Sequence, residues 1–330
     1  MVYVFCFHVD LNKYIYELKY LILGMNYSLF NFFIIVFCCC FYCVSGRTDS
    51  IINRDSTKKG KQFLTEKIIL GESSSIIPKN SLAFFIERRF GTLSGKSNEH
   101  SFLGLDELND YRIGVYYGVF NNLQVGLGRS KINELVEGDL KYRLLEQKNE
   151  GRNFCSVVVF LSSGVSTISS DKIYPLGTVV ENRNNFAHRI KYLSKVVVSR
   201  QFSDVFYFQL VSGYQYRNLI FDSINPSNNR KETNGLPFVG FGGNILLKKG
   251  VCFLMEYFYI ISAYRKNNPK YTFSNPLSIG FQYTKENFTT SINLSNAASV
   301  SGLNFLTGNN GRWDKGNVNI GLSVIRRFRL

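Results

Sequence analysis

The side chains that most often perform catalysis are few in this 330-residue chain and form no recognised set. Beyond an apolar N-terminal segment the histidines are His100 and His188, and neither has a Ser or Asp partner motif of the kind used by enzymes built on membrane barrels. The chain contains no Gly-x-Ser-x-Gly sequence. Two histidines without spaced carboxylates also make a poor metal site. We therefore expect no enzyme activity, no catalytic residue, no metal and no cofactor. Cys155 and Cys252 are expected to be packing residues, with a disulfide between them as the less favoured alternative.

Two features suggest phosphate or nucleic-acid binding, and neither is specific. The segment 126–130 reads GLGRS, which resembles part of a phosphate-binding loop but lacks the Lys-Ser/Thr ending and the following helix. The formal net charge is +15, which is typical of proteins that bind nucleic acid. The basic residues are spread through the chain without a dense cluster, so we expect solvated loops and a polar interior, and no nucleic-acid partner.

Charged residues that alternate with apolar ones are the better candidates for a functional surface. Such a residue lies on one face of its strand together with small and polar neighbours, and the apolar residues lie on the other face. If the sheet closes with its apolar face outward, the charged residues point into the interior. A net-basic interior of this kind favours anions, or holds a plug through ion pairs. The candidates for the interior are Arg112, Lys141, Arg143, Lys191, Lys195 and Glu256.

A period of two in the sequence predicts the strands that position these charges. From Tyr111 to Val119 every second residue is large and apolar, and the Asn121-Asn122 pair that follows suits a tight hairpin. Most predicted strands exceed the mean of a soluble domain, about 5–6 residues, and approach the length needed to cross a bilayer. The predicted strands are 81–91, 111–120, 123–130, 137–147, 154–165, 188–201, 204–217, 236–247, 251–264, 276–285, 287–296 and 317–329.

The lengths of the connections favour a membrane barrel over a soluble β-sandwich. Alternation fits both folds, since a sandwich packs its apolar face on a core and a membrane barrel presents it to lipid. Connections such as 121–122 and 285–286 are very short, whereas those at the other end, such as 92–110 and 166–187, are mostly long. Outer-membrane barrels have short periplasmic turns and long outer loops. We therefore predict an all-β fold, an antiparallel transmembrane β-barrel of about 12 strands with both termini in the periplasm.

The N-terminal part of the chain predicts export from the cytoplasm. Residues 32–44 form an uncharged apolar run with the length of a signal-peptide core, which is short for a membrane-spanning helix. We expect 1–46 to be a signal peptide or export segment, with Met25 as an alternative start. The polar stretch that follows gives 47–80 as a periplasmic lead-in or plug segment, and 81–330 as the barrel domain.

Several short motifs resemble a family of outer-membrane β-barrel proteins of unknown function from Bacteroidota. The resemblance extends over about 61–330 and is strongest before residue 148. Arg88 stands where many members have a histidine, so any role of that histidine is lost here. The resemblance implies an outer-membrane barrel of a Gram-negative cell and names no substrate. The residues that carry it include Arg89, Phe90, Gly91, Asp106, Gly118, Gly128, Arg129 and Ser130.

Together these features predict a bacterial outer-membrane barrel of unknown cargo. It would be a porin-like passive pore or transport component with a net-basic lumen. A non-conducting structural or interaction barrel is the alternative, and a secreted β-sandwich that binds a ligand is a weaker one. The expected partners are outer-membrane lipid including lipopolysaccharide, the barrel-assembly machinery and a small anionic solute. Arg129 lies on the apolar face near the outer end of its strand, where it could reach lipopolysaccharide phosphates.

Overall fold

The computed structural model describes most of the chain after residue 64. The predicted export segment 1–46, the first part of the predicted lead-in and His100 lie outside the described residues. None of the described helices has the length and apolar composition needed to cross a membrane. The described residues are 65–94, 102–148, 153–169, 185–220 and 223–330.

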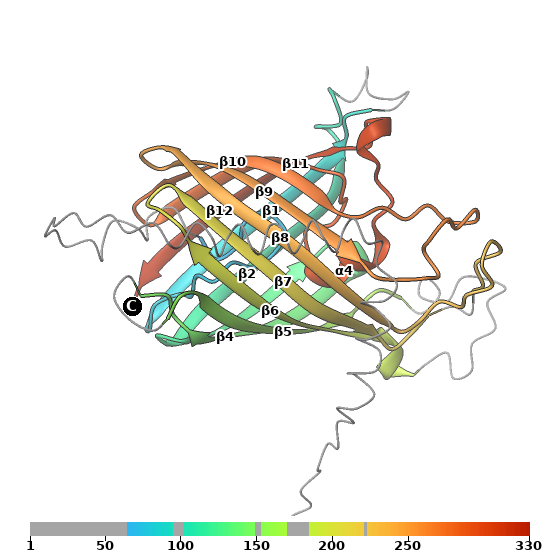
Figure 1. The fold of residues 1–330 in the computed structure, drawn as a ribbon, viewed down its shortest axis with the longest axis horizontal. Helices are drawn as coiled ribbons and strands as arrows, with labels where there is room; N and C mark the ends of the chain where they lie inside the picture. The colour runs from blue at the N-terminus through green and yellow to red at the C-terminus, as the bar shows by residue number, and fades with distance from the viewer. Residues whose placement is uncertain (1–64, 95–101, 149–152, 170–184, 221–222) are drawn as a thin grey trace, which may run out of the picture. The chain divides into compact units, whose positions relative to one another are not determined.

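Twelve antiparallel strands close into a barrel, in which the first strand pairs with both the second and the last (Figure 1). The predicted antiparallel barrel of about 12 strands is thus confirmed, and each predicted strand overlaps an observed one. The strands are β1 (Ser81–Thr92), β2 (Leu108–Phe120), β3 (Leu123–Ser130), β4 (Leu135–Leu145), β5 (Ser156–Ser166), β6 (Ile190–Gln201), β7 (Phe206–Arg217), β8 (Gly235–Lys248), β9 (Val251–Ile260), β10 (Leu277–Lys285), β11 (Phe288–Ser295) and β12 (Asn319–Arg329).

The alternation in the sequence becomes two unlike faces of the barrel wall. In β1, Phe84 and Ile86 are 50% and 55% exposed, whereas Phe85 between them is 2% exposed. In β2, Ile113 is exposed and Arg112 is buried. A wall with large apolar side chains outside and polar ones inside is the pattern of a membrane barrel.

The connections differ in length between the two ends of the barrel. The turns β2–β3, β6–β7, β8–β9 and β10–β11 are short, and Ser81 and Arg329, the ends of the sheet, lie beside them as a pair. We call this the short-turn end. In the β8–β9 turn Gly250 has a φ of 80°, which a residue without a Cβ adopts most readily. The opposite, long-loop end carries the longer connections, with the exception of β3–β4, and holds η1 (Ile132–Glu134), η2 (Phe186–Arg189), η3 (Trp313–Lys315) and α4 (Gly302–Gly308).

Two segments of the chain fill the barrel interior, which we call the lumen. The plug segment (residues 65–78) precedes β1, and the α4 segment (residues 296–309) belongs to the β11–β12 connection at the long-loop end (Figure 1). Most residues of both segments are buried. Apolar residues of the plug segment, the α4 segment and the wall form one core cluster, which includes Leu70, Leu303 and Phe258. Protein therefore packs the lumen both where the plug segment lies and where the α4 segment lies.

Candidate functional site

Two ion pairs, one buried and one partly buried, join the plug segment to the wall. Lys67 Nζ lies 2.9 Å from each carboxylate oxygen of Glu87 on β1. On β12, Arg327 donates from Nε and Nη2 to the two oxygens of Glu66, at 2.8 and 2.7 Å. A bidentate Arg–carboxylate pair fixes orientation as well as distance. Because a charge left unpaired in a protein interior costs several kcal/mol, these pairs hold the plug segment in one register.

A third anchor is a wall carboxylate that binds plug backbone. Glu256 on β9 accepts hydrogen bonds from the N–H groups of Ile69 at 3.3 Å, Leu70 at 2.7 Å and Gly71 at 3.0 Å. These successive N–H groups lie in a tight turn of the plug that is closed by a bridge between Lys67 and Glu72. A set of converging N–H groups is an anion site, and here the anion is supplied by the wall.

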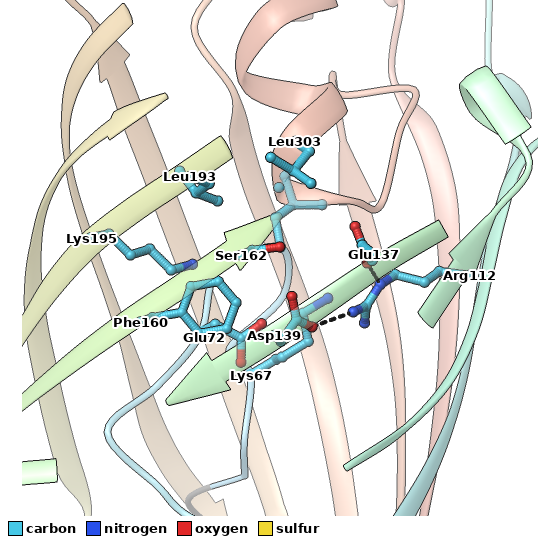
Figure 2. A pocket seen from close by; sticks show the side chains of 12 residues that line it. Lys67, Glu72, Arg112, Glu137, Asp139, Phe160, Ser162, Leu193, Lys195 and Leu303 are labelled. Atoms are coloured by element: carbon cyan, nitrogen blue, oxygen red, sulfur yellow. Dashed lines mark hydrogen bonds and ion pairs between the residues drawn. The ribbon is translucent and has the colours of Figure 1, made fainter. Parts of the chain in front are cut away.

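The plug segment and the α4 segment meet at a small cavity of about 10 Å³, room for about one water molecule (Figure 2). Leu70 and Glu72 line it from the plug and Leu303 lines it from α4. On the wall side, Lys195 Nζ lies 4.4 Å from the centre of the Phe160 ring. A cavity of this size can hold a bridging water but cannot pass a solute.

The Glu72 carboxylate faces Lys141, and Lys67, Arg112 and Lys195 line the same cavity as Glu72. Lys141 Nζ is 3.8 Å from its Oε2 and also donates to the Glu66 carbonyl oxygen at 3.1 Å. Burial favours the neutral form of Glu72, but Lys141, Lys195, Lys67 and Arg112 outweigh it and hold the pKa of Glu72 below its ordinary value. Glu72 is therefore held as an anion inside the lumen.

Arg112 on β2 is the centre of a charge cluster, and Figure 2 shows its guanidinium beside Glu137 and Asp139. Its guanidinium donates to Glu137, to Asp139 at 2.8 Å and to Glu87 at 3.4 Å, and it also reaches the Tyr116 hydroxyl at 3.3 Å. All of these side chains are buried. One guanidinium thus holds three carboxylates. Glu87 lies on β1, next to β2, and Glu137 and Asp139 lie on β4, beyond β3.

The α4 segment is fixed from the same cluster and from Asp110. The Ser301 hydroxyl donates to Glu137 Oε2 at 2.6 Å. Asp110 Oδ2 accepts from the Ser299 hydroxyl at 2.7 Å and from the Val300 N–H at 3.0 Å. These contacts place the turn before α4 against β2 and β4.

Hydrogen bonds from Lys191, Gln215 and Arg265, together with apolar packing, hold the rest of α4. Lys191 Nζ lies 3.1 Å from Asn304 Oδ1, and Gln215 donates to the Leu303 carbonyl oxygen at 2.6 Å. Leu303 is buried in the core cluster with Leu193 of the wall. At the helix end, Arg265 donates to the carbonyl oxygens of residues 306 and 307 at 3.0 and 2.8 Å. Last-turn carbonyls lack partners within a helix, so this arginine satisfies them.

The structure places all six residues proposed for the interior on the inward face. Arg112, Lys141, Lys195 and Glu256 are buried. Arg143 and Lys191 share that face near strand ends and are partly exposed. Arg143 donates to the carbonyl oxygen of Asn121 at 2.9 Å and forms an ion pair with Glu146.

The net charge of the interior stays a prediction. Seven acidic and five basic side chains are buried among the described residues, and the partly exposed Arg143, Lys191, Arg217 and Arg327 also lie on the inward face. Several of the buried acidic residues pair with the predicted cations. The buried charged residues are seven acidic, namely Glu66, Glu72, Glu87, Asp110, Glu137, Asp139 and Glu256, and five basic, namely Lys67, Arg89, Arg112, Lys141 and Lys195.

Three of the family-motif residues support the site. Arg89 is buried and donates to Asn293 at 2.6 Å. A Cβ on Gly128 would lie 3.0–3.2 Å from the Arg112 guanidinium, so the glycine leaves room for that group. A Cβ on Gly118 would lie 2.6 Å from the Ile77 carbonyl oxygen, so the plug backbone can lie directly on β2.

The other motif residues lie away from the cavity. Gly91 donates its N–H to the Gly104 carbonyl oxygen at 2.9 Å and so fixes the β1–β2 loop. Arg129 is outward and 51% exposed, with Glu134 at 3.9 Å. Phe90 and Ser130 are buried, and Asp106 is exposed.

The residues of catalytic type stay apart in the structure. His188 lies in η2 at the long-loop end, and Cys155 and Cys252 are free. Over the described ranges no group of three or more His, Cys, Asp or Glu side chains is arranged to hold a metal ion.

Sequence reasoning missed the acidic half of the site and the α4 segment. Glu137 and Asp139 alternate in phase with Lys141, so the period of two was a usable signal for them. Glu87 and Asp110 carried the same signal on β1 and β2. Ser301 and α4 lie in a connection predicted as a loop, and nothing in their spacing indicates which wall residue they contact.

A model of the family described as membrane bound beta barrel domain (DUF5777) matches residues 63–328. The chain belongs to this family. The resemblance to a barrel family of unknown function is thus confirmed, while its assignment to Bacteroidota stays a prediction. Membership also makes the exposed apolar face of the wall the face of a membrane-bound barrel. No curated protein matches the sequence.

Solved structures of porins are similar to this chain at a low level. A NanC porin is 11% identical, with 76% of this chain and 100% of that chain covered and a TM-score of 0.44. A KdgM porin is 9% identical, with 75% and 99% covered and a TM-score of 0.41. A triple mutant of the Rhodopseudomonas blastica porin is 12% identical, with 67% and 56% covered and a TM-score of 0.29. Likeness at this level says nothing about cargo.

Proposed function

We propose that this protein is a bacterial outer-membrane β-barrel that the plug segment closes from within, so that it conducts no ions while the plug is in place. One observation carries the proposal: the wall supplies a specific buried partner to each anchor of the plug. Glu256 binds three plug N–H groups, Glu87 binds Lys67, and Arg327 binds Glu66. A segment that merely occupied the lumen would not need matched charges.

The proposed location follows from the asymmetry of the two ends. The short-turn end, with both ends of the sheet, would face the periplasm, and the long-loop end would face outward. Arg129, exposed on the outer face near the long-loop end, supports a contact with phosphates of outer-membrane lipid such as lipopolysaccharide. The barrel-assembly machinery is the partner that this location requires. We expect no enzymatic role and no nucleic-acid partner.

A second candidate function is passive transport of a small anionic solute after the plug leaves. The supporting observation is the charge of the wall alone. Inward strand positions that are not exposed carry more basic than acidic side chains, so an emptied lumen would favour anions. The basic side chains are Arg89, Arg112, Lys141, Arg143, Lys191, Lys195, Arg217 and Arg327, and the acidic ones are Glu87, Asp110, Glu137, Asp139 and Glu256.

Planar-bilayer recordings test both functions. We expect the full chain to give no steady single-channel current and a variant lacking both the plug segment and the α4 segment to give one, because both segments fill the lumen. A steady current from the full chain with its plug intact would contradict the closed barrel. Heat-modifiable gel mobility shows that each variant is a folded barrel, and recovery of the protein from the soluble periplasm would contradict the location.

Ion selectivity separates the second candidate from a non-selective hole. In the variant lacking both segments, changing Lys141 and Arg143 to Glu should shift the reversal potential away from anion preference. The matched control changes Arg88 and Arg326 to Glu, because both are exposed on the outward face of the wall. Equal effects of the two pairs would contradict an anion path along the wall.

A further inference from the structure

The plug segment and the α4 segment are joined by one chain of buried polar contacts. Lys67 of the plug pairs with Glu87 at 2.9 Å, and Glu87 lies 3.4 Å from Arg112 Nη1. Arg112 donates to Glu137, and Glu137 accepts from Ser301 of the α4 segment at 2.6 Å. The route begins on one closing segment and ends on the other, with three wall residues between them.

The middle residue of this chain has little freedom to satisfy its partners separately. Arg112 is 3% exposed, and its guanidinium carbon lies 4.3 Å above the Phe85 ring. Gly128 leaves the guanidinium just enough space on the other side. The guanidinium therefore serves Glu87 and Glu137 at the same time from one position.

Loss of the plug changes the charge balance of this cluster. When Lys67 leaves, Glu87 keeps Arg112 as its cation among the pairs described here. A buried carboxylate that loses a partner draws strongly on the remaining one. In the narrow space beside Phe85 and Gly128, even a small shift of the guanidinium toward Glu87 weakens its contact with Glu137, which holds the Ser301 hydroxyl.

We propose that the plug segment and the α4 segment open together, with Arg112 as the residue that couples them. The inference rests on the proposed closed barrel. Release of the plug on the short-turn side loosens α4 on the long-loop side, and by reciprocity a displaced α4 weakens the plug. The barrel then has two populated forms. In one form the plug segment and the α4 segment both close the lumen, and in the other form neither does.

Paired spin labels measure the two closures separately in one molecule. All native cysteines are replaced, and Ser212 on the exposed face of β7 carries the reference label. Ser75→Cys reports on the plug, and Gly308→Cys, where an added side chain meets no neighbour, reports on α4. Each pair gives a narrow distance distribution when its segment is fixed in the lumen and a broad one when it is free.

The release variants are Glu256→Ala, which removes the plug anchor outside the chain of contacts, and a deletion of residues 65–78. We expect the broad population of the α4 pair to rise about tenfold in both, within the range usual for coupled sites. In Glu256→Ala the plug pair should broaden in the same proportion. A narrow α4 distribution in the folded deletion variant would overturn the coupling.

Ser301→Ala cuts the last contact without removing a charge. It should broaden the α4 pair, and adding Glu256→Ala should then broaden it no further. If the double variant instead increases the broad population of the α4 pair by the product of the two single increases, the segments are independent and the proposal is contradicted. Ser291→Ala is the matched control, because Ser291 makes a similar hydroxyl bond to Ser323 on the wall and should change neither pair. A broad plug pair in the unmutated barrel would instead refute the closed barrel itself.

Discussion

The two segments that close the lumen are held by different chemistry. The plug segment meets the wall through charges, as in the pairs Lys67–Glu87 and Glu66–Arg327. The α4 segment has no charged side chain in residues 296–309 and relies on hydrogen bonds to wall residues such as Asp110 and Gln215 and on apolar packing, with Leu303 inside the core cluster. Ion pairs inside a protein are specific in geometry and sensitive to protonation, whereas apolar packing responds mainly to lost volume. The difference indicates that the plug segment is the closure that a change in its own charges can release.

The largest effect is expected where the two chemistries meet. Arg112→Met leaves Glu87, Glu137 and Asp139 without their shared cation, and removing one partner of a buried ionic cluster costs about 3–5 kcal/mol. Urea unfolding in detergent, followed by heat-modifiable gel mobility, measures the free energy of unfolding. Arg129→Met is the control, because Arg129 is exposed on the outer face and should cost less than about 0.5 kcal/mol. If both variants lost a similar free energy of unfolding, Arg112 would not be the residue that holds the three carboxylates together.

A cavity variant tests the apolar side of the comparison. Leu303→Ala removes a fully buried side chain from the contact between α4 and the wall, which we expect to cost about 2–4 kcal/mol. The same unfolding experiment applies, together with hydrogen exchange of residues 296–309, which should accelerate. Unchanged exchange in this segment would show that α4 does not depend on its apolar contact.

A change of volume tests how closely the plug lies on the wall. Gly118→Ala places a Cβ against the carbonyl oxygens of Ile77 and Pro78, so the end of the plug must move, at a cost of about 1–3 kcal/mol. Gly138→Ala is the matched control, since its Cβ meets only Leu127 at 3.9 Å. If both variants unfold at the same urea concentration, the plug does not lie on Gly118.

The smallest effect concerns pH and Glu72. Lys141, Lys195, Lys67 and Arg112 hold its pKa below the ordinary value of 4.5 against the effect of burial. A carboxylate with a depressed pKa stabilises the folded form above its unfolded pKa, and that stability is lost as the pH falls through the folded value. The contribution of Glu72 to holding the labelled plug should therefore be lost as the pH falls below about 4.5. Glu72→Gln should shrink this acid step, and an unchanged step would assign it to other carboxylates.

The sequence predicts the wall well because a period of two is a local signal. Alternation from Tyr111 onward and the Asn121-Asn122 turn identify β2 and β3 without knowledge of any other strand. The same signal places Arg112 and Lys141 on the inward face. It does not predict their partners, because Lys141–Glu72 and Arg112–Asp139 join separate segments of the chain. The closures and the balance of charge depend on such contacts.

Hydrogen–deuterium exchange of residues 65–78 in the membrane-embedded full chain tests the closed barrel most directly. The N–H groups of Ile69, Leu70 and Gly71 donate to the buried Glu256 carboxylate, so they should exchange as slowly as amides in the middle of β9. Protection of this kind would show that the plug is a fixed part of the barrel. Complete exchange of the segment at the earliest time point, with the strands still protected, would contradict the account.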